Sequence, residues 1–366
     1  MRNQLSPQFI VLTLAVGHYS VPAQPVLSVA RSGNHPVLSW STSNSNCILQ
    51  CASSLATQDW SPVTHPVTTT INGKVAFTIT NTAYANFYRL CNTTAGMVLI
   101  PAGSFTMGDS LDQTADAIPT LNVTVSAFYV DAKLIEYSQW QSVYDWATNQ
   151  GYGFDYAGSG RAADQPAQTL DWWDAVKWCN ARSQRAGLTP VYYSDAKFRQ
   201  VYTNGEMTPY VNWATNGYRL PTEAEWEKAA RGGASERRFP WGDTISETQA
   251  NYYSAPELYS YDLGPAGFNA AYTNGVAPYT NPGGAFAANG YGLYDMAGNA
   301  WQWCWDWYGT PYAGGSNPRG AATGTDRILR GGAWFYNAYY ERCANRGHNT
   351  PTVKSDTVGL RCVRGP

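Results

Sequence analysis

The sequence predicts an α+β protein, in which a small all-β domain precedes a larger domain with helices first and irregular strands later. Two patterns lead to this prediction. Residues 25–92 consist of short runs of β-forming residues separated by Ser, Asn and Pro. Helical periodicity is confined to residues 136–233, whereas residues 235–366 are dense in Gly, Asn, Tyr and Trp.

The composition excludes several classes of protein. Charged residues make up 14% of the 366 residues, and aromatic residues make up another 14%. An ordinary soluble domain has roughly 25% charged residues, so a coiled coil, a charged helical bundle and a disordered chain are excluded. The net charge of −2, without a basic run, predicts no nucleic-acid partner. Only His348 of the four histidines lies beyond residue 65, which excludes a histidine-rich metal site in the larger domain.

The N-terminus predicts export to the periplasm, the cell surface or the medium. An apolar run, Phe9–Val16, follows Arg2, and Val21–Ala23 has the spacing of a cleavage site, so residues 1–23 are expected to be a signal peptide. The alternative is a buried strand of the first domain. The run is too short to span a bilayer and no other segment reaches 18 apolar residues, so no membrane span is expected.

The first domain is expected to be a β-sandwich over residues 25–92 that serves as a spacer or an adhesion module. Asn72-Gly73 lies between two runs of alternating β-forming residues, which predicts a hairpin with a two-residue turn. The expected strands are residues 37–40, 47–51, 68–71, 75–80 and 87–90.

Three helices are expected in the second domain, residues 96–366. The first covers residues 136–148, and the second covers residues 172–183 with Asp171 as its N-cap. Thr222 and Glu225 form the T-x-x-E pattern of a capping box, which opens a third helix that ends at Gly232. A strand is expected over Trp301–Trp307, where alternate residues face opposite ways.

Several motifs in this domain occur in a characteristic order. They are Met97–Gly108 (MVLIPAGSFTMG), Gly217–Glu227 (GYRLPTEAEWE) with Ala230–Gly233 (ARGG), Phe239–Gly242 (FPWG), Asn289–Trp303 (NGYGLYDMAGNAWQW), Leu329–Trp334 (LRGGAW) and Val358–Cys362 (VGLRC). In this order they resemble the formylglycine-generating enzyme, or sulfatase-modifying factor, family. The resemblance implies that family's variant of the C-type lectin fold, with much irregular structure and a small mixed sheet.

The same motifs contain arginines that require partners if they are buried. The arginines are Arg219, Arg330, Arg342, Arg346 and Arg361. Glu225, Asp295 and Asp306 are the expected partners.

The family resemblance also implies an activity that this sequence does not support. The family oxidises a cysteine of a sulfatase peptide to formylglycine, with copper(I) held by two cysteines between the Gly-Gly and Arg-Cys motifs. Here that interval, Ala333–Glu341, contains no cysteine, and Ala338 stands where the second thiol would fall. Because copper(I) requires soft ligands, we expect no copper site. The alternatives are an oxidase or related enzyme with altered chemistry, and a maturation factor or structural component of the cell envelope.

Aromatic residues occupy the interval instead, which predicts an exported, non-catalytic binding protein with a protein or a glycan as its partner. Tyrosine and tryptophan rings offer a large contact area at low entropic cost. We expect Trp334 in the core and at least two of Phe335, Tyr336, Tyr339 and Tyr340 to be exposed; alternatively, alternate rings belong to the core. The candidate ligand-binding residues are Phe335, Tyr336, Asn337, Tyr339, Tyr340, Arg346, His348 and Asn349.

A subset of the family resembles retroelement-diversified variable proteins, whose C-terminal segment is rewritten at adenines of AAY-type codons. The residue types reachable from such codons occupy positions 335–337, 339–340, 347–349, 352–353 and 355–357. Glu341 and Lys354 do not fit this pattern.

The resemblance further implies two calcium sites, and calcium is the structural ion it suggests. Asn251 and Phe268 match the first site, and Asn299, Ala300 and Gln302 match the second. Ala266 replaces an expected Asp, and Gln302 replaces the usual Glu. Both departures remove a carboxylate, which weakens a calcium site.

The seven cysteines are consistent with an oxidising compartment, and none forms a CxxC pair. The resemblance implies a disulfide between Cys179 and Cys362. A second bridge is expected between Cys304 and Cys343, because Ala230 occupies the position of the family's partner for Cys343; free thiols are the alternative. The early cysteines are Cys47, Cys51 and Cys91, of which the first two lie roughly 13 Å apart along a strand and cannot pair with each other.

Overall fold

The computed structural model describes residues 26–32, 35–41, 47–52, 61–62, 68–79, 87–92, 96–186 and 188–366. The chain divides into two compact units, Met1–Ala95 and Gly96–Pro366. The expected signal peptide, residues 1–23, lies outside the described residues. In the part of the chain that is described, no helix is long and apolar enough to cross a membrane.

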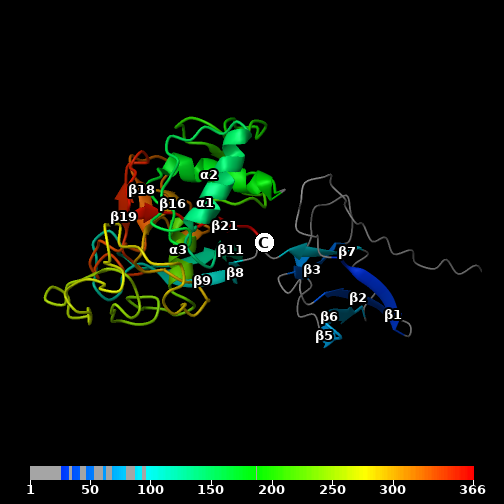
Figure 1. Cartoon of the computed structure of the whole chain (residues 1–366), viewed down its shortest axis with the longest axis horizontal. Coiled ribbons are helices and arrows are strands. Elements are labelled where there is room, and N and C mark those ends of the chain that lie inside the picture. The colour runs from blue at the N-terminus through cyan, green and yellow to red at the C-terminus, as the bar shows by residue number, and fades with distance from the viewer. Residues whose placement is uncertain are drawn as a thin grey trace, which may run out of the picture. The chain divides into compact units, whose positions relative to one another are not determined.

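The described strands of the first unit form two antiparallel sheets (Figure 1), in the orders β1-β2-β6-β5 and β4-β3-β7. The strands are β1 Ser28–Ser32, β2 His35–Ser41, β3 Cys47–Ala52, β4 Ser61–Pro62, β5 Thr68–Ile71, β6 Lys74–Thr78 and β7 Phe87–Asn92. Leu38 and Trp40 of β2 share one buried cluster with Leu49 of β3, so the two sheets pack against each other. Asn72 and Gly73 have φ values of 50° and 72°, as a type I′ hairpin turn between β5 and β6 requires.

The second unit contains three helices, α1 Tyr137–Asn149, α2 Trp172–Arg185 and α3 Glu223–Ala230. The expected caps are present: Asp171 accepts a hydrogen bond from the N–H of Asp174, and Thr222 and Glu225 form a complete capping box. Helices α1 and α2 lie side by side (Figure 1), and the rings of Trp140 and Trp178 stack between them with centroids 5.4 Å apart.

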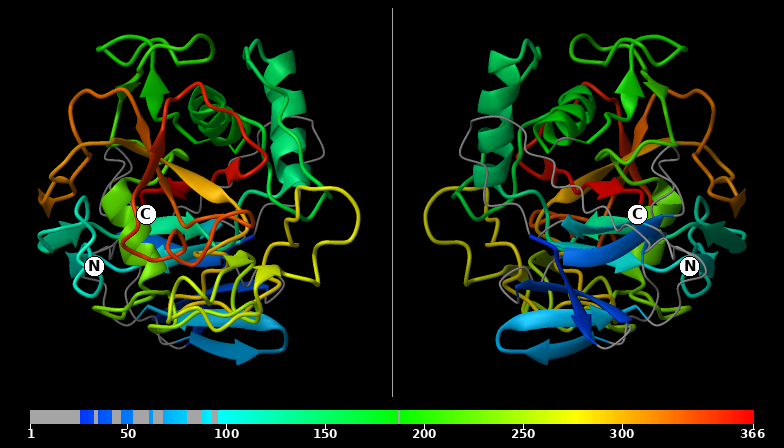
Figure 2. Two further views of the ribbon diagram at one scale, coloured as in Figure 1. Left: turned by 90° about the vertical axis from the view of Figure 1, so that its left-hand side faces the viewer. Right: turned by 90° about the vertical axis from the view of Figure 1, so that its right-hand side faces the viewer.

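Short strands make up the rest of the regular structure of this unit. They are β8 Met97–Ile100, β9 Gly103–Met107, β10 Leu121–Val125, β11 Phe128–Asp131, β12 Tyr192–Tyr193, β13 Tyr210–Val211, β14 Tyr253–Ser254, β15 Gly267–Phe268, β16 Trp301–Trp307, β17 Gly315–Ser316, β18 Arg327–Arg330, β19 Gly347–Asn349, β20 Val358–Gly359 and β21 Val363–Arg364. Loops dominate between α3 and β16 (Figure 2). The predicted α+β class is confirmed.

The mixed sheet β19-β18-β16-β20 positions the candidate site. Strand β16 pairs antiparallel with β18 and parallel with β20, and it is buried on both faces. Trp301, Trp303 and Trp305 face the large core cluster that surrounds α2, whereas Cys304 faces a second cluster. The alternation predicted for this strand is therefore confirmed.

Candidate ligand-binding groove

A groove of about 430 Å³ runs along the mixed sheet. Its buried floor consists of Trp301 of β16, Leu329 of β18 and Val358 of β20. Residues 335–357, called the C-terminal segment below, supply the remaining lining, namely Tyr336, Tyr340, Arg346, Gly347, His348, Asn349, Val353, Ser355 and Thr357. Five of the eight predicted ligand-binding residues line this groove, whereas Phe335, Asn337 and Tyr339 lie outside the lining.

The two tyrosines of the groove, Tyr336 and Tyr340, pack against Trp301. The ring of Tyr336 meets Trp301 edge-on at 5.5 Å between centroids, and the ring of Tyr340 does so at 6.1 Å. The two tyrosine rings also touch each other, with their centroids 5.2 Å apart. The two tyrosine rings therefore form one side of the groove, packed against Trp301 of its floor.

The exposure of the aromatic stretch differs in part from the prediction. Trp334 is buried as expected, and Phe335 is 56% exposed. Tyr336, Tyr339 and Tyr340 are only half-buried, so the expectation that at least two of the four rings are exposed is wrong. Tyr336 and Tyr340 lose exposure to Trp301, and Tyr339 loses it to the guanidinium of Arg342, 4.1 Å from its ring.

Exposure along the C-terminal segment follows a simple division. Positions 335–337, 339–340, 347–349, 352–353 and 355–356 are all exposed or half-buried. Ala338 and the run from Glu341 to Arg346 are buried between them. The buried positions hold the segment in place, and the accessible ones offer their side chains to solvent.

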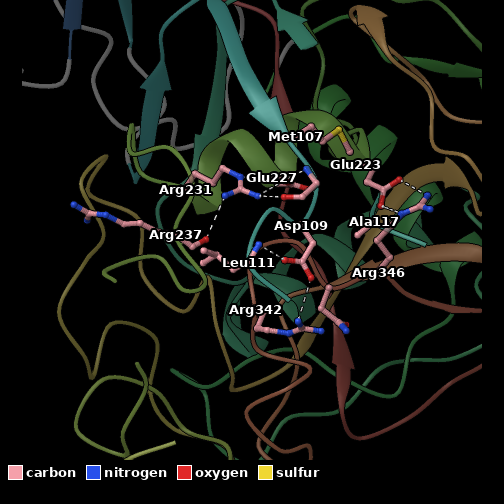
Figure 3. Close-up of polar contacts among 12 residues, drawn as sticks. Met107, Asp109, Leu111, Ala117, Glu223, Glu227, Arg231, Arg237, Arg342 and Arg346 are labelled. Atoms are coloured by element: carbon pink, nitrogen blue, oxygen red, sulfur yellow. Dashed lines mark hydrogen bonds and ion pairs between the residues drawn. The ribbon is translucent and has the colours of Figure 1, made fainter. Parts of the chain in front are cut away.

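Two buried arginines of the segment, Arg342 and Arg346, bind acidic residues outside it, as Figure 3 shows. The Nη1 atom of Arg342 lies 3.3 Å from Asp109 and 2.8 Å from Asp112. Arg346 donates two hydrogen bonds to Glu223, with lengths of 2.7 and 2.9 Å. Arg346 was predicted to contact a ligand; it lines the groove, but it is only 6% exposed and its guanidinium is bound to Glu223.

Two of the acidic partners in α3, Glu223 and Glu227, were not anticipated from the sequence. Glu223 and Glu227 lie one turn apart and are both buried. Glu227 binds Arg231 at 2.7 Å and also Arg330. Burial opposes ionisation of Glu227, but the two guanidinium groups outweigh it and hold the pKa of this carboxyl below its ordinary value. The i, i+4 spacing of two acids in a capped helix was the signal that could have revealed this pair.

The other predicted arginine partners are partly correct. Arg219 pairs with Glu225 at 2.6 Å, as expected. Arg361 instead donates to backbone carbonyls, including that of Asp131 at 2.6 Å, and to Gln302.

Glu341 is a buried carboxyl beneath the aromatic stretch. Its Oε1 accepts a hydrogen bond of 3.1 Å from the N–H of Ala333, and Oε2 has no partner among the described residues. The carboxyl lies directly on Gly332, where an added Cβ would come within 2.2 Å of it. Burial raises the pKa of Glu341 well above its ordinary value, and the N–H groups of Ala333 and Gly298 offset only part of this effect.

The residues present do not fit a copper(I) site. Ala338, at the position of the family's second thiol, is completely buried in a cluster with Phe239, Ile245 and Tyr252. A methyl group therefore fills the space, and the interval Ala333–Glu341 contains no cysteine that could supply a thiolate to a soft metal.

The predicted calcium positions are occupied by internal hydrogen bonds. Gln302 Oε1 accepts from Trp226 at 2.8 Å and from Arg361 at 2.9 Å, so it has no free oxygen to offer a cation at the second site. The Oδ1 of Asn299 accepts from the N–H of Asn281, while the backbone of Ala300 is buried beside it. At the first site the amide of Asn251 donates to the Tyr279 carbonyl, and Phe268 lies in β15. Calcium binding stays a prediction.

Within the described ranges, one other group of acids is close enough to hold a metal ion. It comprises Asp155, Asp171 and Glu206 and includes no predicted calcium ligand. Lys177 already pairs with Asp155 at 2.8 Å and lies 3.1 Å from Asp174, so a buried ammonium supplies positive charge there.

The four late cysteines are buried free thiols in the structure. The Sγ atoms of Cys179 and Cys362 lie 3.5 Å apart, whereas a disulfide bond is about 2.05 Å long. Cys304 and Cys343 share one core cluster. Both expected bridges stay predictions. The side chains of Cys47, Cys51 and Cys91 lie outside the described residues.

Comparison with known proteins agrees with this architecture. The family model described as the sulfatase-modifying factor enzyme 1-like domain matches residues 83–366. The formylglycine-generating enzyme of Bos taurus is 33% identical over 292 residues, which cover 73% of this chain and 74% of the relative. The chaperone protein LppX of Paenibacillus barcinonensis is 30% identical over 280 residues, covering 75% and 91% of the two chains. The solved structure of Treponema denticola variable protein 1 is similar with a TM-score of 0.58 at 24% identity, covering 82% of this chain and 98% of that one. The chain therefore belongs to the sulfatase-modifying factor family, which includes the formylglycine-generating enzymes.

Proposed function

We propose that this protein is an exported, non-catalytic binding protein that presents its aromatic groove to a protein or a glycan. The observation that carries the proposal is the division of the C-terminal segment into buried anchors and accessible side chains. Eight of the accessible or AAY-compatible positions line one groove, at residues 336, 340, 347–349, 353, 355 and 357. A groove of this volume, with apolar rings and a few polar groups, has the character of a ligand site.

The same division supports diversification of the segment by a retroelement. Of the positions assigned above to the codon pattern, all but Thr357 are exposed or half-buried. Glu341, which does not fit the codon pattern, is one of the buried anchors. Substitution at accessible positions usually changes stability by less than about 0.5 kcal/mol, so such a segment tolerates replacement.

Binding arrays test the proposal. We expect the wild type to bind a member of a protein or glycan array, and Y336A/Y340A to lose that binding by roughly 30-fold or more, as truncation of a hot spot predicts. Tyr210→Ala is the matched control, because Tyr210 is an exposed ring of β13 outside the groove. Equal binding by the double variant and the wild type would refute the role of the groove.

The competing function is an oxidase of the formylglycine-generating type, which the identity to such enzymes favours. A copper(I) titration in the presence of a sulfatase-type cysteine peptide separates the two. We expect no stoichiometric copper binding and no formylglycine product. Stoichiometric copper(I) binding or formation of formylglycine would overturn the non-catalytic proposal.

A further inference from the structure

We propose that Asp326 fixes His348 in one neutral tautomer, so that the Nε2 atom of His348 serves the groove as a directed hydrogen-bond acceptor for an uncharged donor group. This inference rests on the proposed function, since it assigns a chemical preference to the same groove. The ligand group it predicts is a neutral hydroxyl or amide N–H, as opposed to an anion.

Three neighbouring strands bring the parts together. His348 lies in β19 opposite Ile328 of β18, and Asp326 immediately precedes β18. The N–H of Tyr308, which follows β16, donates a hydrogen bond to the Asp326 carbonyl. The placement of the histidine relative to the acid therefore follows from the sheet register and does not depend on a loop.

The contact itself defines which nitrogen carries the proton. Asp326 Oδ2 lies 2.7 Å from Nδ1 of His348. A carboxylate only accepts hydrogen bonds, so in the neutral ring Nδ1 is the donor and Nε2 keeps its lone pair. Tyr308 holds the ring in place, stacked on it at 3.8 Å between centroids and 23° between planes.

The Nε2 atom is available to a ligand. It has no hydrogen-bond partner among the residues that the structure describes, and the side chain of His348 is 39% exposed. His348 lines the groove together with Tyr336 and Tyr340.

The charges of the lining favour a neutral ligand. Arg346 is the only cation of fixed charge in the lining, and Glu223 already neutralises it by two hydrogen bonds. The lining contains no carboxylate. A ligand anion would find no free cation to compensate its desolvation, whereas a hydroxyl or an amide would find the imidazole acceptor.

The first test reads the tautomer without any ligand. Two-bond proton–nitrogen correlations of the full chain labelled with ¹⁵N-histidine distinguish the two neutral tautomers and the cation. We expect the signal that disappears in H348Q to show Nδ1 protonated. In D326N the amide of the new side chain can donate to Nδ1, so we expect the Nε2–H tautomer to dominate. Asp356→Asn, which removes the charge of another exposed acid on the segment, should leave the pattern unchanged.

The second test uses three small aromatic probes that differ in one group. Phenol carries an uncharged O–H donor, anisole lacks it, and benzoate is an anion. We expect phenol to shift the Nε2 resonance of His348 at least several-fold more than anisole or benzoate, and to lose this advantage in D326N. An Nε2–H tautomer or an imidazolium cation in the wild type, in each of which Nε2 is a donor, would overturn the inference, as would equal shifts by phenol and anisole.

The two proposals fail in different ways. If the tautomer is wrong but Y336A/Y340A still loses array binding, the groove remains a binding site without this acceptor. If the tautomer is as expected but the tyrosine variants bind normally, the proposed function alone fails.

Discussion

Because the carboxyl of Glu341 is buried, we expect the stability of this domain to fall as the pH rises. Burial raises the pKa of the carboxyl well above the ordinary value of 4.5. The folded protein therefore holds the proton more tightly than the unfolded chain does. The resulting stabilisation is fully present below the unfolded pKa and is lost as the pH rises through the folded pKa. Glu341→Gln keeps the shape and the acceptor for the Ala333 N–H but cannot ionise.

The magnitude follows from proton linkage. Between the unfolded and the folded pKa of Glu341, the free energy of unfolding of the wild type falls by about 1.4 kcal/mol for each pH unit. Among the described residues, no arginine or lysine contributes to this shift, so no ion pair compensates the charge when it forms. The stability of E341Q relative to the wild type should therefore increase with pH along this slope, whatever the offset between them at low pH.

Urea denaturation at several pH values between about 5 and 8 measures this difference. Plotting the free energy of unfolding of E341Q minus that of the wild type isolates the site, because all other titrating groups cancel. Glu257→Gln, at an exposed carboxyl, is the control and should give a flat line. A flat line for E341Q as well would refute the assignment of a buried, uncompensated carboxyl at this position.

Three further predictions concern the anchors, the thiols and the aromatic surface. Glu223→Gln should lower the free energy of unfolding by about 3–5 kcal/mol, because it leaves the buried Arg346 uncompensated. The control Glu136→Gln, at an exposed pair with Lys133, should lower it by less than about 1 kcal/mol. Urea denaturation measures both. Oxidation of the purified protein should join Cys179 to Cys362 and raise the free energy of unfolding by about 5 kcal/mol for a 183-residue separation. Non-reducing mass spectrometry identifies the bond, and free thiols on both residues would be the contrary result. Phe335→Ala should leave the melting temperature nearly unchanged, since the ring is mostly exposed. It should weaken array binding, because the ring adjoins the groove residue Tyr336 at 5.9 Å between centroids; a large loss of melting temperature would show that the ring is structural.

Local signals explain why the helices and the strand of tryptophans could be predicted. The caps at Asp171 and Thr222 each satisfy the N–H group three residues away, so the pattern is complete within one turn of chain. Strand β16 likewise shows its alternation over seven consecutive residues. The ordered motifs then identified the fold, because their spacing reflects contacts that the sequence alone does not display.

The anchors and the groove could not be predicted in the same way. Glu223 and Arg346 are 123 residues apart, and neither residue carries a local sign of its partner. The groove arises where Trp301, Leu329 and Val358 come together in the sheet, which depends on strand order. The half-burial of Tyr336 and Tyr340 follows from that same contact with Trp301, so the exposure of these rings was misjudged.

The way the segment is anchored explains how a fold shared with enzymes can change function without losing stability. Three buried residues of the segment contact partners outside it: Arg342 contacts Asp109, Arg346 contacts Glu223, and Ala338 packs in the cluster with Tyr252. Burial opposes ionisation of Asp109, but Thr114, backbone N–H groups and Arg342 outweigh it and keep the pKa of this acid below its ordinary value, so the ion pair persists at acidic pH. None of these contacts involves the side chains at positions 336, 340 or 347–349, which line the groove. Apart from Arg346, which also lines the groove, the residues that anchor the backbone differ from those whose side chains line the groove, so exchanging the latter should leave the anchors intact.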